Sequence, residues 1–105
     1  MIRAATAEDV KSLYGGALDV PADLLVIEDN GVKAIGGVVW IDGQAVGTCK
    51  VLPGCSKKEL LRAARAVCAA GPLIARRDRT IAGADRFLRW LGFVPVDGVT
   101  YERLG

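Results

Sequence analysis

The stretch Ile81–Phe93 constrains the fold of this chain more than any other. It reads Ile-Ala-Gly-Ala-Asp-Arg-Phe-Leu-Arg-Trp-Leu-Gly-Phe. Phe87, Leu88 and Leu91 have the spacing of one apolar face of a helix. Gly92 stands where a helix commonly ends on a residue in the left-handed conformation. The stretch therefore predicts a short amphipathic helix that stops at the glycine and continues directly into a strand.

The size and composition predict one globular domain over residues 1–105. A chain of 105 residues supports a single core. Hydrophobic residues make up 51% and charged residues 25% of the chain, which is unlike the composition of disordered proteins. No apolar run approaches the ~20 residues of a membrane span, and the N-terminal segment lacks the apolar stretch of a secretory signal. We therefore expect a cytoplasmic protein with no membrane partner.

The three cysteines, Cys49, Cys55 and Cys68, are expected to be reduced structural thiols. Their number is odd, they have no CxxC spacing, and the chain contains no histidine. A zinc site is therefore not expected. The absence of imidazole also excludes Ser-His-Asp and Cys-His catalysis, because no histidine is present to act as the base.

Charge is distributed unevenly along the chain, although the net charge is only +2. Residues 1–31 carry two basic against six acidic side chains, a balance of −4, whereas residues 50–89 carry ten basic against three acidic ones, a balance of +7. A basic half can meet nucleic acid or the phosphates of a cofactor. The alternative is that these cations are the solvated faces of two helices.

Caps and turns divide the chain into alternating elements. Thr6 and Ser56 each begin a capping box, with Asp9 and Glu59 as the third residue of the helix. Asn-Gly at 30–31 and Asp-Gly at 42–43 and 97–98 predict turns between strands. Helices are expected after Thr6 up to Gly15-Gly16, from 57 to 70, and in the stretch 81–92. Strands are expected at 2–5, 23–29, 32–41, 44–52, 73–75, 93–96 and 99–103.

This order predicts an α/β (α+β) fold with a mixed, mostly antiparallel sheet of six or seven strands and about three helices on its faces. Strands 44–52 and 73–75 should be parallel, because a helix crosses between them. The Gly36-Gly37 pair indicates a bulge or a close approach of two backbones. The predicted core consists of Ile27, Ile35, Val39, Val51, Leu60, Leu61, Ala64, Val67, Phe87, Leu88 and Leu91.

The element order and two motifs resemble the GNAT (Gcn5-related N-acetyltransferase) superfamily. The closing segment is similar to its "Phe-Tyr-x-x-x-Gly-Phe" motif, with Leu88 at the tyrosine position. The opening Ile-Arg-x-Ala-Thr-x-Glu-Asp segment is similar to many GNAT N-termini. The resemblance implies a GNAT-like fold and an acyl-CoA-dependent N-acetyltransferase activity toward an unknown amine, with acetyl-CoA as cofactor.

GNAT enzymes hold the pyrophosphate of the cofactor in a glycine-rich loop that opens a helix. The corresponding segment here is Leu52-Pro-Gly-Cys-Ser-Lys-Lys-Glu59, which has a single glycine. The resemblance implies that any cofactor site uses Val51, Leu52, Cys55, Ser56, Lys57 and Lys58. The alternative is a plain capped helix, because Ser56 already satisfies one of the amides.

The resemblance also implies a general base and a tyrosine acid, and both depart from the family pattern. Strand 44–52 carries no carboxylate, so the candidate bases are Glu28 and Glu102 on other strands. The alternative for both is a solvated strand position, which we favour. Leu88 cannot donate a proton, and Tyr101 on the last strand is a candidate outside the motif. No catalytic residue is assigned from the sequence.

A narrower resemblance connects the chain with small GNAT-like proteins of short-tailed phages. These share an Ala-Ile-Gly-Gly strand, present here at 34–37, and a basic helix in place of the glycine-rich loop. They also share the closing Arg-Phe-Leu-x-x-x-Gly pattern, present here at 86–92. This resemblance implies a catalytically silent protein that acts as a virion component or as a protein-binding module, located in the virion.

Two functions of different classes therefore stand side by side: an N-acyltransferase with a reduced site, and a silent module with a protein partner such as phage virion proteins. Nucleic-acid binding is the weakest alternative. Aromatic residues total only 6% of the chain, and no strand carries the paired aromatics on which bases stack.

Overall fold

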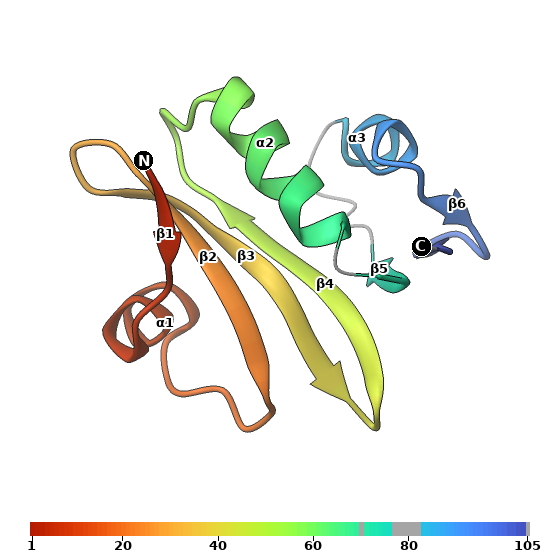
Figure 1. Ribbon diagram of the computed structural model, residues 1–105, viewed down its shortest axis with the longest axis horizontal. Coiled ribbons are helices and arrows are strands. Elements are labelled where there is room, and N and C mark those ends of the chain that lie inside the picture. Colours follow the sequence, from red (N-terminus) through yellow and green to blue (C-terminus); the bar gives the residue numbers. More distant parts are fainter. Residues whose placement is uncertain (70, 77–82, 105) are drawn as a thin grey trace.

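Seven strands in one sheet organise the part of the chain that the structure describes. The structure is a computed structural model that describes residues 1–69, 71–76 and 83–104. The described residues confirm the predicted mixed, mostly antiparallel sheet with three helices (Figure 1). The elements are β1 (Ile2–Ala4), α1 (Ala7–Tyr14), β2 (Ala22–Glu28), β3 (Val32–Ile41), β4 (Gln44–Val51), α2 (Lys57–Cys68), β5 (Leu73–Arg76), α3 (Ala84–Trp90), β6 (Val94–Pro95) and β7 (Thr100–Arg103). The first residues of the predicted closing stretch, 81 and 82, lie outside the described residues.

The strands follow the spatial order β1-β2-β3-β4-β5-β7-β6. All neighbours are antiparallel except β4 and β5, which run parallel. A parallel pair needs a crossover connection, and α2 lies in it. The predicted parallel pair is therefore confirmed, and β4 and β5 join the two halves of the sheet.

The helices cover opposite faces of the sheet. Successive strand residues point to opposite faces, so Val26 and Ile27 belong to different layers. Val26 lies in a cluster with Ile35 and the α1 side chains Val10, Leu13 and Tyr14. Ile27 lies in a cluster with Ala34 and Ala63 of α2. Figure 1 shows α2 and α3 next to each other and α1 well apart from them.

The caps that begin α1 and α2 are those that the sequence predicted, with one difference. In α1 the Asp9 N–H donates to Thr6 Oγ1 at 3.2 Å, and the Thr6 N–H donates to the Asp9 carboxylate at 2.8 Å. In α2 the Glu59 N–H donates to Ser56 Oγ at 3.3 Å. The Glu59 carboxylate does not complete the box, because it accepts from the Met1 ammonium at 2.9 Å. The α-helical span of α2 ends at Cys68 with Ala69 as its cap, and residue 70, the expected end, lies outside the described residues.

The helix-to-strand junction after α3 is a Schellman motif. Gly92 has φ 94°, and its N–H donates to the Arg89 carbonyl at 3.0 Å. The Phe93 N–H donates to the Leu88 carbonyl, also at 3.0 Å. This confirms the role predicted for Gly92, and it places Phe93, which is 5% exposed, in the core.

The Gly36-Gly37 pair in β3 allows a close approach of the neighbouring strands. A Cβ on Gly37 would lie 2.1 Å from the Asp23 carbonyl oxygen of β2, and one on Gly36 would lie 2.7 Å from the Thr48 carbonyl oxygen of β4. Such contacts are not tolerated, so β2, β3 and β4 can pair as they do only with glycine at both positions. The register shift lies instead between Ile27 and Glu28 of β2.

The predicted core is confirmed in the strands and only partly in the helices. Ile27, Ile35 and Val39 are buried. Val51 was predicted wrongly, because it is 43% exposed at the end of β4, where no described strand lies on its β5 side. The predicted helical residues are partly buried: Leu60, Leu61, Ala64, Val67, Phe87, Leu88 and Leu91. Further buried side chains include Tyr101, Phe93, Leu73, Ala75, Val38, Val26, Leu24, Ala34, Ala63 and Cys68.

Among the described residues, no helix is long and apolar enough to cross a membrane.

Candidate functional site

The strands β4 and β5 diverge after a very short paired segment. Val46 pairs with Ile74 and Gly47 with Ala75, whereas β4 continues to Val51 with β3 as its partner. Residues 48–51 therefore have β3 on one side and no described strand on the other. The sheet opens here, and β4 forms one wall of the opening.

The segment from Leu52 to Lys58 leads from the end of β4 into the first turn of α2. The Leu52 N–H donates to the Lys33 carbonyl at 2.8 Å, and the Cys55 N–H donates to the Leu52 carbonyl at 3.4 Å. The first N–H groups of a helix have no acceptor within the helix. Because Ser56 Oγ accepts only that of Glu59, the N–H groups of Lys57 and Lys58 remain available to an anion.

A lysine that the sequence reading missed borders the same segment. A Cβ on Gly54 would lie 3.9 Å from Lys33 Nζ. Lys57 and Lys58 are exposed in the first turn of α2. The side chains of Lys33, Lys57 and Lys58 therefore all border the segment between β4 and α2. The position of Lys33 on β3, the strand next to β4, could have indicated that it lies near this segment. No sequence motif includes it.

Two of the three catalytic candidates are held in structural contacts. Glu28, at the end of β2, pairs with Arg3 at 3.3 Å. Tyr101 is 2% exposed, and its hydroxyl donates to the Asp85 carboxylate of α3. Leu88, at the family's tyrosine position, packs against the same core cluster as Tyr101. Both side chains are therefore engaged with neighbouring residues of the described part of the chain.

Glu102, the third candidate, lies on the sheet face opposite Tyr101. The registers align Val46 of β4, Ile74 of β5, Glu102 of β7 and Val94 of β6 in one row across the sheet. This row lies on the same face as α1, because Val46 packs against the cluster that α1 covers. Glu102 is thus a half-buried carboxylate on the strand next to β5.

Tyr14, at the end of α1, is the tyrosine on the β4 side of the opening. Its hydroxyl is buried and makes no hydrogen bond of normal geometry in the described part of the chain. Burial raises the pKa of Tyr14, and the nearby Thr48 hydroxyl on β4 opposes that shift. Tyr14 matches no family motif, so the sequence alone does not point to it.

The comparisons with known proteins concern the fold. No protein-family model matches the sequence, and no curated protein matches it. A solved structure from Bordetella pertussis, assigned to the GnaT-family acetyltransferases, superposes with a TM-score of 0.61. The match covers 92% of this chain and 70% of that one, at 16% identity. The chain has the GNAT fold. At 16% identity this likeness establishes the fold alone. The chemistry has to be inferred from the residues of the candidate site.

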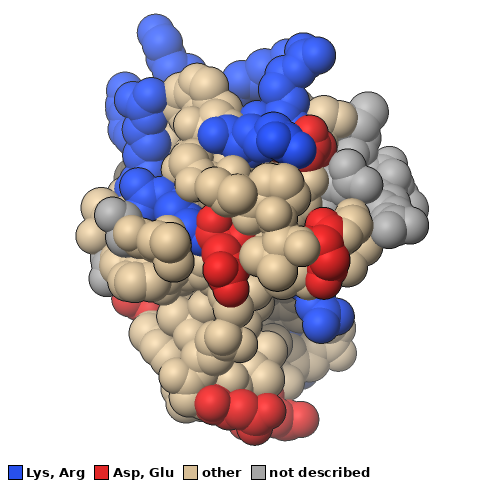
Figure 2. All heavy atoms as spheres, turned by 90° about the vertical axis from the view of Figure 1, so that its right-hand side faces the viewer, with Lys and Arg blue, Asp and Glu red and all other residues tan. Residues whose placement is uncertain are grey.

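The basic half of the sequence forms an exposed face of this GNAT fold. Figure 2 shows lysine and arginine side chains gathered at one end of the molecule. The exposed cations of α2 and α3 are Lys57, Lys58, Arg62, Arg65, Arg86 and Arg89. Arg65 lies over the Trp90 ring at 4.3 Å, and Arg89 pairs with Asp85 at 3.0 Å. Part of the positive charge is therefore used in contacts between and within the two helices.

The three thiols of the GNAT fold are free and differ in exposure. Cys49 is exposed on β4, Cys55 is half-buried and Cys68 is buried. Desolvation of the sulfur by surrounding protein atoms raises the pKa of all three. A raised pKa keeps them as thiols at neutral pH, so they are poor nucleophiles.

Proposed function

We propose that the protein is an acyl-CoA-dependent N-acyltransferase whose cofactor lies in the opening between β4 and β5. The observation that carries the proposal is the early divergence of these strands beside the N-terminus of α2. The GNAT resemblance implies that the pantetheine arm would lie at this divergence and the pyrophosphate at the following helix. An acyl-CoA supplies an acyl group activated as a thioester.

The residues present fit such a cofactor. Thr48 to Val51 offer backbone groups on the open side of β4, which an extended amide chain can pair with. The N–H groups of Lys57 and Lys58 suit a pyrophosphate, because the helix dipole favours negative charge there. The ammonium groups of Lys33, Lys57 and Lys58 add positive charge.

Glu102 is the favoured general base. Of the two candidate carboxylates it is the one whose strand, β7, pairs directly with β5. A carboxylate here accepts a proton from the acceptor amine directly or through a water molecule. The favoured acid is Tyr14, whose buried hydroxyl faces Thr48 at the edge of the opening.

The second candidate is a catalytically silent GNAT-fold protein that binds a protein partner, including the virion role that the phage resemblance implies. Three observations favour it. Ser56 caps α2 in place of a glycine-rich loop, and Leu88 is part of the core. In addition, Trp90, Val94 and Val96 are 49%, 65% and 59% exposed.

Calorimetry with acetyl-CoA and with desulpho-CoA distinguishes the two. The enzyme is expected to bind both ligands with a Kd in the micromolar range, about −8 kcal/mol, because both carry the same phosphates and pantetheine amides. Absence of binding at millimolar ligand would contradict the enzyme and leave the silent module. An assay of thiol release from acetyl-CoA with a panel of amines then tests turnover.

A further inference from the structure

Most cations of α2 and α3 have no acidic partner. The two helices contain one acid each, Glu59 and Asp85. Glu59 pairs with the Met1 ammonium at 2.9 Å, and Asp85 pairs with Arg89 at 3.0 Å. Both acids are therefore already engaged. The exposed cations of these helices that form no ion pair within the described ranges are Lys57, Lys58, Arg62, Arg65 and Arg86.

Three of these cations form a stripe along α2. Lys58, Arg62 and Arg65 are spaced by four and three residues, which brings them onto the same face of the helix. Like charges at this spacing are unfavourable for a helix. The stripe therefore lowers the stability of the isolated protein, and a partner with negative charge would relieve the repulsion.

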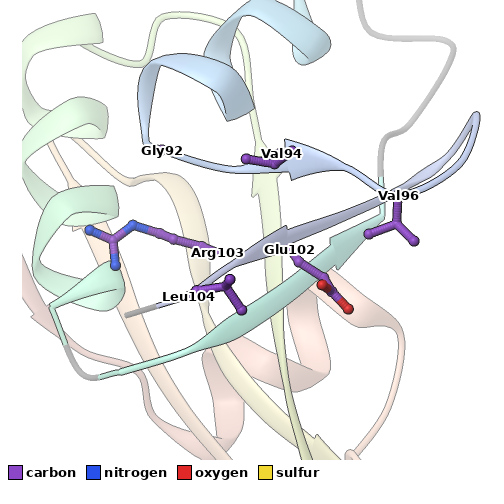
Figure 3. A pocket seen from close by; sticks show the side chains of 6 residues that line it. All are labelled: Gly92, Val94, Val96, Glu102, Arg103 and Leu104. Carbon is purple, nitrogen blue, oxygen red and sulfur yellow. The ribbon is translucent and has the colours of Figure 1, made fainter.

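Two contacts hold α2 and α3 together. Arg103 of β7 donates from Nε to the Leu91 carbonyl at the end of α3, at 2.8 Å, and from Nη1 to the Cys68 carbonyl at the end of α2, at 2.9 Å. In Figure 3 its side chain extends toward α2. The Arg65 guanidinium lies over the Trp90 ring at 4.3 Å. The cations of the two helices are therefore presented together.

The basic stripe of α2 continues onto α3 through the Trp90 ring. Trp90 contacts Arg65, and it lies four residues after Arg86, on the same face of α3. We call this continuous patch the arginine surface. It consists of Arg62, Arg65, Arg86 and Trp90. Lysine and arginine side chains gather at this end of the molecule in Figure 2.

Trp90 indicates which anionic partner the arginine surface fits. The ring is 49% exposed although Arg65 lies over it. Surfaces that bind single-stranded nucleic acid combine cations, which contact phosphates, with aromatic rings, on which bases stack. The bases of a duplex are already stacked on each other and leave such a ring unused. The ring lies on a helix, so the lack of paired aromatics on the strands does not bear on it.

We propose that the arginine surface binds single-stranded nucleic acid without sequence preference. Arg62 and Arg86 contact phosphates, and a base stacks on Trp90 beside Arg65. None of these residues is assigned to the cofactor. The inference therefore goes beyond the proposed function and does not depend on it.

The experiment titrates the full chain with single-stranded DNA and RNA oligonucleotides. In the variant Trp40→Phe, Trp90 is the only tryptophan, and we expect its fluorescence to be quenched when a base stacks on it. Fluorescence anisotropy of labelled oligonucleotides measures the affinity of the wild type. Its logarithm should fall with the logarithm of salt concentration with a slope of about −2, because three arginines each contribute about −0.7.

Matched variants test the surface itself. Arg62→Glu/Arg86→Glu should weaken binding at least about tenfold. Lys11→Glu/Arg76→Glu, with the same change in net charge outside the surface, should bind like the wild type. Trp90→Ala should weaken binding at least about fivefold. Circular dichroism checks the fold of each variant, and the single variants Arg62→Ala and Arg86→Ala replace the double variant if it does not fold.

Several outcomes would overturn the proposal. One is that the wild type binds neither oligonucleotide at low salt. Another is that the two double variants bind equally well, or that Trp90→Ala binds like the wild type. Tighter binding of a duplex of the same length would show that phosphates alone are recognised. Equally tight binding of polyglutamate would indicate an acidic protein partner instead.

Discussion

Gly47 of β4 and Ala75 of β5 form the last pair at which these two strands meet in the described part of the chain. Beyond them β4 follows β3 alone, and the chain passes through a short segment into α2. The position of this pair determines where the opening begins. It also explains why Val51 is exposed although its sequence context resembles a buried strand.

The two phenylalanines should differ in their contribution to stability. Phe93→Ala is expected to lower the free energy of unfolding by ~3–5 kcal/mol, because the ring is 5% exposed in the cluster with Tyr101. Phe87→Ala should cost less than about 3 kcal/mol, since Phe87 is only half-buried on α3. Urea denaturation of both variants measures the difference. A larger loss for Phe87→Ala would mean that α3 docks through another face.

The two tyrosines provide a matched test of buried hydroxyl groups. Tyr101→Phe removes a hydrogen bond to the Asp85 carboxylate and should cost about 1.5–3 kcal/mol. Tyr14→Phe removes a hydroxyl without a well-formed hydrogen bond among the described residues, and it should change stability by less than about 0.5 kcal/mol. Thermal and urea melts of both variants decide between these values. Equal losses would contradict the assignment of a partner to one hydroxyl only.

The Arg3–Asp9 pair should make stability depend on acid pH. Arg3 Nη1 lies 2.7 Å from Asp9 Oδ2, and this contact, followed by the Thr6 N–H, holds the pKa of Asp9 well below its usual range. A depressed pKa contributes stability above the unfolded value of about 3.9, and that stability is lost as pH falls toward the folded value.

Asp9→Asn should therefore be less stable than the wild type at pH 6, and the difference should shrink steadily below about pH 4. Urea melts at a series of pH values measure it. Glu8→Gln, which removes an exposed acid of the same helix, serves as the control for net charge. A difference between Asp9→Asn and the wild type that stayed constant down to pH 2 would contradict the linkage.

The thiols should become accessible in the order of their exposure. A thiol reagent is expected to modify Cys49 first in the native protein and Cys68 only on unfolding. In denaturant without reductant, titration should give three free thiols. A total of one would demonstrate a disulfide and refute the assignment of all three as free.

Local features of the fold were predictable because their causes are local. Thr6, Ser56, Gly92 and the Asn-Gly and Asp-Gly turns act through hydrogen bonds and φ angles within a few residues. The parallel pairing of β4 and β5 followed from the same signals through the rule for parallel crossovers. The exposure of Val51 was missed because it depends on where a distant strand diverges.

The residues of the candidate site were harder to predict from the sequence than the elements of the fold. Glu28, Tyr101 and Glu102 could not be distinguished in the sequence, since each lies on a strand and the face it occupies depends on pairing partners. Lys33 was missed because its proximity to Gly54 arises from the β3–β4 register.

The central claim is that the opening beside α2 binds a coenzyme A thioester, and charge reversal at Lys57 and Lys58 tests it most directly. As exposed contacts these lysines should contribute on the order of 1 kcal/mol each. Calorimetry should therefore show at least about tenfold weaker acetyl-CoA binding for Lys57→Glu/Lys58→Glu. The melting temperature should stay nearly unchanged, and Lys11→Glu/Arg86→Glu, with the same change in net charge, should bind like the wild type. Three outcomes would contradict the account: both double variants bind acetyl-CoA equally weakly, the Lys57/Lys58 variant binds it as well as the wild type does, or the wild type does not bind it at millimolar concentration.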